Sequence, residues 1–261
     1  MAAFSITILA IVIVLVVFFS YQAHDLDDVL EDQTLRVVTE YSSIGYFVED
    51  DQIKGFQYEL IKRFADSLGV TLDFTVEPDL QKSIDGVNNG DYDLIMRGLP
   101  VTLELKKQLD FSEPLIKSKL VLVQRTDYKN KNKLAVRSTV DLDGITIYVT
   151  PNSPYLMRLK HIEEELGIAI YTKSIPDVDN ESLIAMVARG EIDYTIADEF
   201  TARFLQTFYP ELDITMQIGF KQFQAWGFSK HSFKLQKAVN DWLNSFTKTK
   251  EYRDLYRTYY R

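Results

Sequence analysis

The stretch NNGDYDLIMRGLPVTLELKKQLDFSEPL, residues 88–115, decides the fold class of this 261-residue chain. Its segment YDLIM is an apolar strand that follows the polar turn NNGD. It is the third strand of a series, because two strand-like segments and two amphipathic helix patterns precede it. In chain order these are LRVVTEY at 35–41, FQYELIKRFADSLGV at 56–70, TLDFTVEP at 71–78 and LQKSIDGVNNG at 80–90. This β-α-β-α-β order predicts a mainly parallel sheet with helices on both faces.

The same order of elements starts again at residue 144. Its members are GITIYVT, PYLMRLKHIEEELG, IAIYTKSI, NESLIAMVARG and YTIAD, which ends at residue 198. Two extended segments, SKLVLVQRTD at 118–127 and FQAWGFSK at 223–230, connect the two α/β units. Two crossings imply that the C-terminal helical stretch completes the first lobe, so a ligand would be held between lobes that close about a hinge. We therefore expect lobe 1 at 35–120, lobe 2 at 121–218, and the return hinge with the end of lobe 1 at 219–261.

An apolar run precedes the folded part. Residues 2–19 read AAFSITILAIVIVLVVFF, and about 18 apolar residues are close to what a helix needs to cross a bilayer. A cleaved signal peptide is the alternative, but Tyr21 stands where a small residue is expected. We expect residues 1–20 to be a single-pass anchor or signal peptide and the acidic residues 21–34 to be a short tether or a first helix. The folded part is then expected in the periplasm or outside the cell.

The composition excludes several classes of protein. The formal charge of −9, from 29 basic and 38 acidic residues, argues against nucleic acid as a partner. The absence of cysteine excludes disulfides, thiolate zinc sites, cysteine nucleophiles and a lipid-modified cysteine. The three histidines, His24, His161 and His231, show no metal-ligand spacing, and no nucleophile-elbow or phosphate-loop motif occurs. We expect no cofactor and no catalysis; a cleft glutamate such as Glu40 leaves a dehydratase-type enzyme as the alternative.

Three motifs resemble the family 3 solute-binding proteins, which share the type II periplasmic-binding-protein fold. They are GFQYELIKRFADSLGV at 55–70, the opening stretch at 88–115, and GEIDYTIAD at 190–198. The chain also resembles the receptor-like N-terminal half of membrane-bound lytic murein transglycosylases F, which begin with a membrane segment and have a similar DYTIAD stretch. The lytic domain of those enzymes would follow residue 261, so the resemblance implies a receptor without the lytic reaction.

The loops after the first and the third strand carry candidate ligand contacts in lobe 1. In the family an aromatic residue of the first loop packs on the ligand, which points to Tyr41 or Tyr46 here. The loop MRGLPVT implies ligand contacts from the backbone at Gly98 and a hydroxyl at Thr102. The family's carboxylate-binding arginine position is Leu105 and its Ser/Thr position is Pro100. Arg97 is therefore expected to supply the positive fork, with Lys106 as a second charge.

Lobe 2 contributes the other candidates. The segment TPNSPY matches the family's loop that opens a helix toward an anionic group, and it offers Asn152 and Ser153. Asp198 matches the aspartate that pairs with the ligand α-amino group; capping of the following helix is the alternative role for this residue. The resemblance thus implies that the residue that binds the ligand amine matches the family, whereas two of the positions that bind the ligand carboxylate differ from it.

The ligand class and the partners stay open at this point. Small peptides, amino-acid derivatives and cell-wall muropeptides fit at least as well as a free amino acid. A permease or a separate lytic transglycosylase is the expected protein partner, so the chain serves either transport or sensing.

Overall fold

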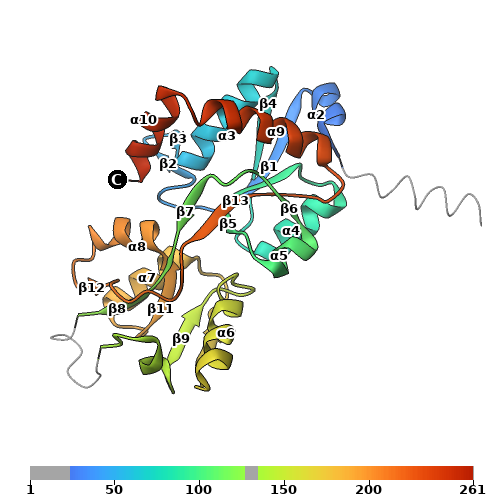
Figure 1. Cartoon of the computed structure of the whole chain (residues 1–261). Helices are drawn as coiled ribbons and strands as arrows, with labels where there is room; N and C mark the ends of the chain where they lie inside the picture. The colour runs from blue at the N-terminus through green and yellow to red at the C-terminus, as the bar shows by residue number, and fades with distance from the viewer. Residues whose placement is uncertain (1–23, 127–134, 261) are drawn as a thin grey trace, which may run out of the picture.

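A computed structural model describes residues 24–126 and 135–260, and it shows two α/β lobes joined by two crossings (Figure 1). Lobe 1 holds the blue, cyan and red segments, and lobe 2 the yellow and orange ones. The apolar run predicted as an anchor, residues 2–19, lies outside the described residues. Among the residues that are described, no helix is long and apolar enough to cross a membrane.

The sheet of lobe 1 combines parallel and antiparallel strands in the order β4-β1-β5-β13-β6, and β7 also pairs with β13. β1 is parallel to β4 and β5, whereas β13 runs antiparallel to β5, β6 and β7. The C-terminal part of the chain therefore enters the middle of the sheet that the N-terminal part builds. The strands are β1 (Thr34–Thr39), β4 (Thr71–Val76), β5 (Leu94–Pro100), β6 (Asp110–Phe111), β7 (Ile116–Ser118) and β13 (Gln222–Phe228).

Helices cover this sheet, and a hairpin of β2 (Phe47–Glu49) and β3 (Gln52–Lys54) lies at its side. Local sequence explains the helix ends. Gly69 adopts the left-handed conformation that terminates α3 (Phe56–Leu68), and Asp79 accepts hydrogen bonds from the first turn of α4 (Leu80–Asn89). The helices are α2 (Leu26–Asp32), α3 (Phe56–Leu68), α4 (Leu80–Asn89), α5 (Leu103–Gln108), α9 (Phe233–Phe246) and α10 (Lys250–Tyr259).

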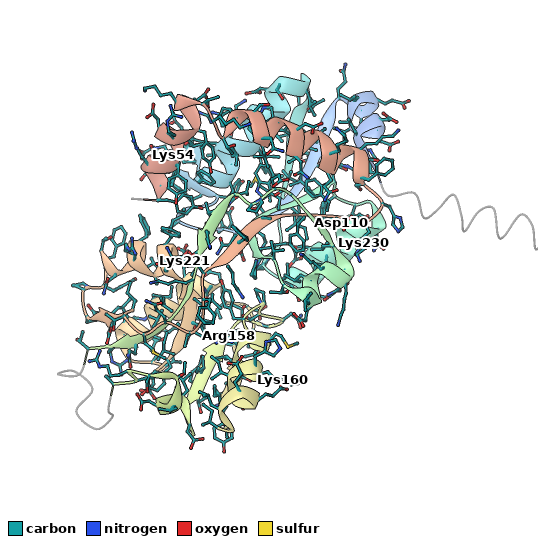
Figure 2. The ribbon with its side chains drawn as sticks, in the orientation of Figure 1. Lys54, Asp110, Arg158, Lys160, Lys221 and Lys230 are labelled. Carbon is teal, nitrogen blue, oxygen red and sulfur yellow. The ribbon has the colours of Figure 1, made fainter. Side chains whose placement is uncertain are left out.

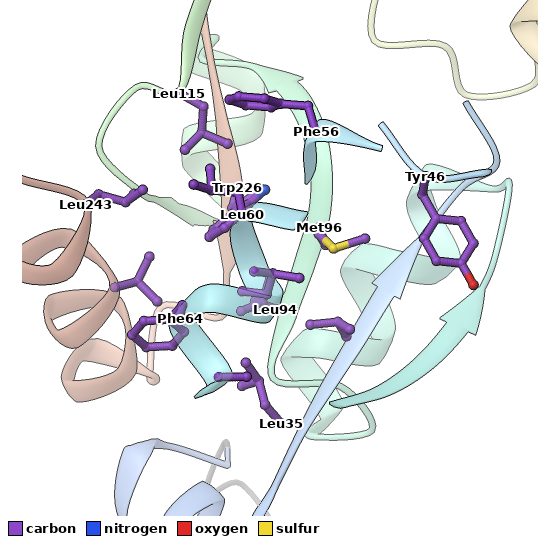
Figure 3. Packing of buried hydrophobic residues seen from close by; sticks show 14 of the residues in the cluster. Leu35, Tyr46, Phe56, Leu60, Phe64, Leu94, Met96, Leu115, Trp226 and Leu243 are labelled. Carbon is purple, nitrogen blue, oxygen red and sulfur yellow. The ribbon is translucent and has the colours of Figure 1, made fainter. Parts of the chain in front are cut away.

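The core of lobe 1 joins residues from both ends of the chain (Figure 3). Trp226 of β13 is fully buried and packs with Leu60 and Phe64 of α3 and with Leu243 of α9. Its indole Nε1 donates a 2.6 Å hydrogen bond to Oε1 of Gln57, so the one polar atom of the ring is satisfied. The C-terminal segment therefore supplies β13 to the sheet of lobe 1 and side chains to its core.

Lobe 2 repeats the arrangement with strand order β10-β9-β11-β8-β12. β9 is parallel to β10 and β11, and β8 is antiparallel to β11 and β12. The strands are β8 (Leu120–Arg125), β9 (Thr146–Val149), β10 (Tyr171–Ser174), β11 (Thr195–Asp198) and β12 (Leu212–Asp213); the helices are η2 (Thr139–Leu142), α6 (Leu156–Leu166), α7 (Asn180–Arg189) and α8 (Glu199–Gln206). The crossings run from β7 into β8 and through Lys221 back into β13 (Figure 2).

The segment predicted as a tether or first helix contains α2, which is docked on lobe 1. Val29 of this helix is fully buried in the lobe 1 core. The carboxylate of Asp25 accepts a 2.7 Å hydrogen bond from the backbone N–H of Leu235, and Ser232 Oγ donates to the carbonyl of His24 at 2.8 Å. The folded part of the chain therefore includes residues from His24 onward and begins before the predicted boundary at Leu35.

Candidate ligand-binding cleft

A cavity lies between the lobes, at the carboxyl ends of β1, β9 and β11 and beside the end of β5. This is the position at which open α/β sheets bind ligands. The lining residues come from both lobes and from the hinge strands β7 and β13. They are Thr39, Glu40, Tyr41, Ser42, Ile44, Gly45, Gln57, Pro78, Met96, Arg97, Gly98, Ile116, Thr150, Ser153, Pro154, Tyr155, Val178, Asp179, Asn180, Glu181, Asp198, Thr201, Gln224 and Tyr260.

Arg97 and Glu40 form an ion pair on the lobe 1 side of the cavity. Nη2 of Arg97 lies 2.7 Å from Oε2 of Glu40, and the arginine side chain is only 11% exposed. Nη1 of Arg97 is buried and has no hydrogen-bond partner in the described part of the chain. Burial raises the pKa of the Glu40 carboxyl; the charge of Arg97 opposes this and the carboxylates of Asp179 and Glu181 add to it. The guanidinium thus retains an unused donor for an anionic group.

Asp198 joins lobe 2 to the hinge. It ends β11 and caps α8, because Oδ1 accepts a 2.9 Å hydrogen bond from the N–H of Phe200. Oδ2 accepts from the hydroxyl of Ser118 on β7 and, at 2.6 Å, from Nε2 of Gln224 on β13. Burial raises the pKa of this carboxyl although the three hydrogen bonds lower it. Both roles considered for Asp198, a helix cap and a residue facing the ligand cavity, are compatible with this position.

The loop after β9 places Ser153 and Tyr155 against the cavity. Ser153 is 7% exposed, and the backbone N–H of Tyr155 lies 3.4 Å from its hydroxyl oxygen, so the hydroxyl hydrogen remains available. Pro154 follows without an N–H to donate. Burial raises the pKa of the Tyr155 phenol well above its ordinary value, and the carboxylates of Asp198 and Glu40 add to the shift. Tyr155 is therefore protonated at physiological pH and can donate a hydrogen bond.

Five of the residues proposed from sequence line the cavity: Tyr41, Arg97, Gly98, Ser153 and Asp198. Gly98 permits a close contact here, since a Cβ atom at this position would lie 2.5 Å from Oε1 of Gln224.

Four proposed residues lie elsewhere. Tyr46 is 6% exposed and packs in the lobe 1 core, with its ring centroid 5.5 Å from that of Phe74. Thr102 caps α5 by accepting a 3.2 Å hydrogen bond from the N–H of Leu105. Asn152 adopts a positive φ of 53° at the edge of the cleft, where its Nδ2 lies 3.4 Å from Oδ1 of Asp79. Lys106 is exposed on α5 and does not line the cavity.

Contacts across the cleft hold the two lobes together. The backbone N–H of Ser43, in the loop after β1, donates a 2.7 Å hydrogen bond to Oε1 of Glu181 at the start of α7. The Ser43 hydroxyl donates to the other oxygen of the same carboxylate. The ring of Tyr260, after α10, lies edge-on to Phe200 of α8 with centroids 4.8 Å apart. The loops that line the cavity are therefore also the loops through which the lobes touch.

The cavity is also lined by residues that were not predicted from the sequence, among them Glu181, Tyr155, Gln224 and Tyr260. Glu181 could have been found, because it follows the strand IAIYTKSI and the rule that selects loops after strands applies there too. Gln224 and Tyr260 gave no such signal, since they reach the cavity only through the second crossing. Among residues 24–126 and 135–260, no group of three or more His, Cys, Asp or Glu side chains has the geometry to hold a metal ion.

A two-lobed α/β architecture with a polar cavity between the lobes and two hinge crossings is typical of solute-binding proteins. This chain belongs to the bacterial extracellular solute-binding proteins, family 3, whose model matches residues 35–261. The resemblance inferred from the three sequence motifs is thus confirmed.

The curated relatives that match most of this chain are longer proteins. The membrane-bound lytic murein transglycosylase F of Desulfosudis oleivorans is 27% identical over 86% of this chain and 48% of its own length. That of Erwinia tasmaniensis is 31% identical over 81% of this chain and 40% of its own length. The chain therefore spans less than half the length of these relatives, and their names describe the whole proteins.

Solved structures support the fold. A mutant of the arginine-binding protein ArgBP from T. maritima superposes with a TM-score of 0.78 at 22% identity, covering 90% of this chain and 98% of that one. An ancestral arginine-binding protein bound to arginine gives a TM-score of 0.75 at 24% identity, covering 88% and 99%. At these identities the likeness confirms the two-lobed α/β fold.

Proposed function

We propose that this chain is a membrane-anchored extracytoplasmic binding protein that holds a small amino-acid-like ligand between its lobes and releases it unchanged. The observation that carries the proposal is the guanidinium of Arg97: the residue lines a cavity formed by both lobes, and its buried Nη1 atom has no hydrogen-bond partner among the described residues. A buried guanidinium donor without an acceptor is costly, and a ligand carboxylate would satisfy it.

The proposed ligand contacts come from both sides of the cavity. Arg97 and the backbone at Gly98 hold the carboxylate, and Tyr41 packs on the apolar part of the ligand. From lobe 2, Ser153 donates a hydrogen bond and Asp198 accepts one from the ligand amine. Because contacts from both lobes are made only when the lobes are closed, ligand binding favours the closed conformation. Amino-acid derivatives, short peptides and muropeptides all present this pair of groups.

A thermal-shift screen of the full chain in mild detergent tests the proposal. The panel contains amino acids, short peptides and muropeptides, because a ligand specific for the folded state raises the melting temperature by mass action. The proposal expects a hit that is lost in Asp198→Ala and in Arg97→Met, with the ligand recovered chemically unchanged. A folded protein that responds to no member of the panel would contradict a ligand-binding role, and a ligand recovered in altered form would indicate the enzyme alternative.

A sensor that reports its ligand to a lytic transglycosylase is a second candidate function. It is supported by the names of relatives that match over most of this chain. The test mixes the full chain with a purified lytic transglycosylase and measures murein cleavage with and without the identified ligand. A change in rate that depends on the ligand favours sensing, whereas an unchanged rate favours delivery to a permease.

A further inference from the structure

The cavity carries an excess of acidic side chains. Among the described residues that line it, four are carboxylates, Glu40, Asp179, Glu181 and Asp198, and one is a guanidinium, Arg97. Charges of like sign that share a desolvated site repel one another strongly, because little water screens them. An empty cavity with this lining is electrostatically unfavourable, and a bound cation would relieve the repulsion.

Two of the four carboxylates already act as helix caps, which uses part of their acceptor capacity. Asp179 caps α7 by accepting a 2.6 Å hydrogen bond from the N–H of Ser182. Asp198 caps α8 and accepts from both hinge strands. The remaining two, Glu40 and Glu181, come from opposite lobes and line the same cavity, where the charge of Glu181 adds to the raised pKa of Glu40.

Glu181 has acceptor capacity left. Ser43 donates one hydrogen bond to each of its oxygens, and a carboxylate offers about four acceptor positions in total. No cationic side chain in the described part of the chain forms an ion pair with Glu181, whereas Glu40 has Arg97. On the lobe 2 side, none of the residues that the structure describes therefore supplies a counter-charge.

This inference rests on the proposed function. We propose that the ligand carries an ammonium or guanidinium group beyond its α-amino group. Glu181 is the specificity-determining residue that binds this group from lobe 2, and Glu40 faces the group from lobe 1. The α-carboxylate then goes to Nη1 of Arg97. The Ser43 loop holds the Glu181 carboxylate in place, so the cationic group becomes enclosed when the lobes close.

Isothermal titration of the full chain with matched ligand pairs tests this assignment. L-arginine is compared with L-citrulline, which replaces the guanidinium by a neutral urea of similar shape, and L-lysine with L-norleucine, which lacks the ammonium. We expect the cationic member of at least one pair to bind about tenfold tighter or more, as for the loss of one charge-assisted hydrogen bond. In Glu181→Gln this preference should fall by a similar factor while the affinity for the neutral member stays the same.

Two further variants serve as controls, and the outcome of the titrations distinguishes a failure of the role of Glu181 from a failure of the proposed function. Glu164→Gln changes an exposed glutamate on α6 and should keep the preference. Glu181→Asp keeps the charge on a shorter side chain and guards against a folding defect, which melting curves of all variants would reveal. Neutral ligands that bind as tightly as cationic ones, or a preference that survives in Glu181→Gln, would overturn the role of Glu181 and leave ligand binding intact. No binding by any amino acid, peptide or muropeptide would overturn both.

Discussion

Nη2 of Arg97 lies 2.7 Å from Oε2 of Glu40, while Nη1 of the same guanidinium is buried without a hydrogen-bond partner in the described residues. Nη2 of Arg97 is thus paired with the Glu40 carboxylate, and Nη1 remains as a donor for a second carboxylate. Leu105, where the sequence resemblance led us to expect the position of the family's ligand-binding arginine, is buried in a hydrophobic cluster with Leu109 and Ile84. Among the described residues, the cationic side chain that lines the cavity comes instead from β5, beside Glu40.

Replacement of Arg97 should weaken ligand binding and also destabilise the empty protein. Arg97→Met leaves the half-buried carboxylate of Glu40, 31% exposed, without its counter-charge, and the loss of a charged hydrogen bond costs roughly 1.5–3 kcal/mol. We expect the free energy of unfolding to fall by an amount of this order, measured by urea titration, and the ligand affinity to fall at least tenfold. In the double variant Glu40→Gln/Arg97→Met the loss of stability should be smaller, because no unpaired carboxylate remains. Equal stability losses in the single and double variants would contradict the pairing.

The affinity for a cationic ligand should rise with pH in the mildly acidic range. Burial raises the pKa values of Glu40 and Glu181 above the ordinary 4.5, and that of Asp198 above 3.8. A carboxyl whose pKa is raised by folding binds protons more tightly in the folded state, so its contribution to stability is present below the unfolded pKa and is lost as pH rises through the folded value. A cationic ligand binds preferentially to the ionised carboxylates, so ligand binding releases protons. The affinity for such a ligand therefore increases over the pH interval in which these carboxyls ionise.

Titration calorimetry at several pH values, in buffers of different ionisation enthalpy, measures this proton release. Arg97, Asp179 and Tyr155 also face these groups. Burial keeps the pKa of the Tyr155 phenol above its ordinary value, so the phenol stays neutral in this range. The double variant Glu40→Gln/Glu181→Gln should show a flatter pH profile than the natural chain. A profile that is unchanged in this variant would assign the pH dependence to Asp198 instead.

Gly98→Ala should act through its neighbour Gln224. A Cβ at position 98 would lie 2.5 Å from Oε1 of Gln224, and the amide is at the end of a flexible side chain that can move away. Movement of the amide would break its 2.6 Å hydrogen bond to Asp198, which normally lowers the pKa of that carboxyl. We expect a several-fold loss of affinity, and a loss of stability of about 1–3 kcal/mol from the hydrogen bond.

A double-mutant cycle with Gln224→Ala checks the route. Gln224→Ala removes the same hydrogen bond without adding a Cβ, so the two single variants should resemble one another and their effects should not add. Additive losses of affinity would indicate that residue 98 contacts the ligand independently of Gln224.

The alternation of strands and helices was sufficient to predict both lobes and their order, because each element carries its own apolar periodicity and its own stop signal, such as Gly69. Asp198 and Arg97 could be placed at the cleft for the same reason, since both follow or end predicted strands. Glu181 and Tyr260 are different. Glu181 acquires its role from Ser43 on the other lobe, and Tyr260 contacts the cavity only because β13 and α10 return to lobe 1. Such contacts between distant segments have no periodic signature in a single sequence.

The Ser43–Glu181 contact should set how readily the empty protein closes. Ser43→Ala removes the hydroxyl donor to Glu181 but keeps the 2.7 Å backbone hydrogen bond, so the closed form loses one charge-assisted interaction that the open form does not make. We expect the radius of gyration of the ligand-free variant, measured by small-angle X-ray scattering, to increase and the ligand affinity to decrease by up to about tenfold.

Saturating ligand should restore the compact form of Ser43→Ala, because contacts from both lobes then outweigh the missing hydrogen bond. Ser67→Ala is the matched control, since the Ser67 hydroxyl bonds the Phe64 carbonyl within α3, on one lobe alone. The control should leave both scattering and affinity as in the natural chain. If Ser43→Ala also left both unchanged, the contact would be a consequence of closure rather than a contribution to it, and closure in the absence of ligand would have to rest on other contacts, such as the Phe200–Tyr260 ring pair.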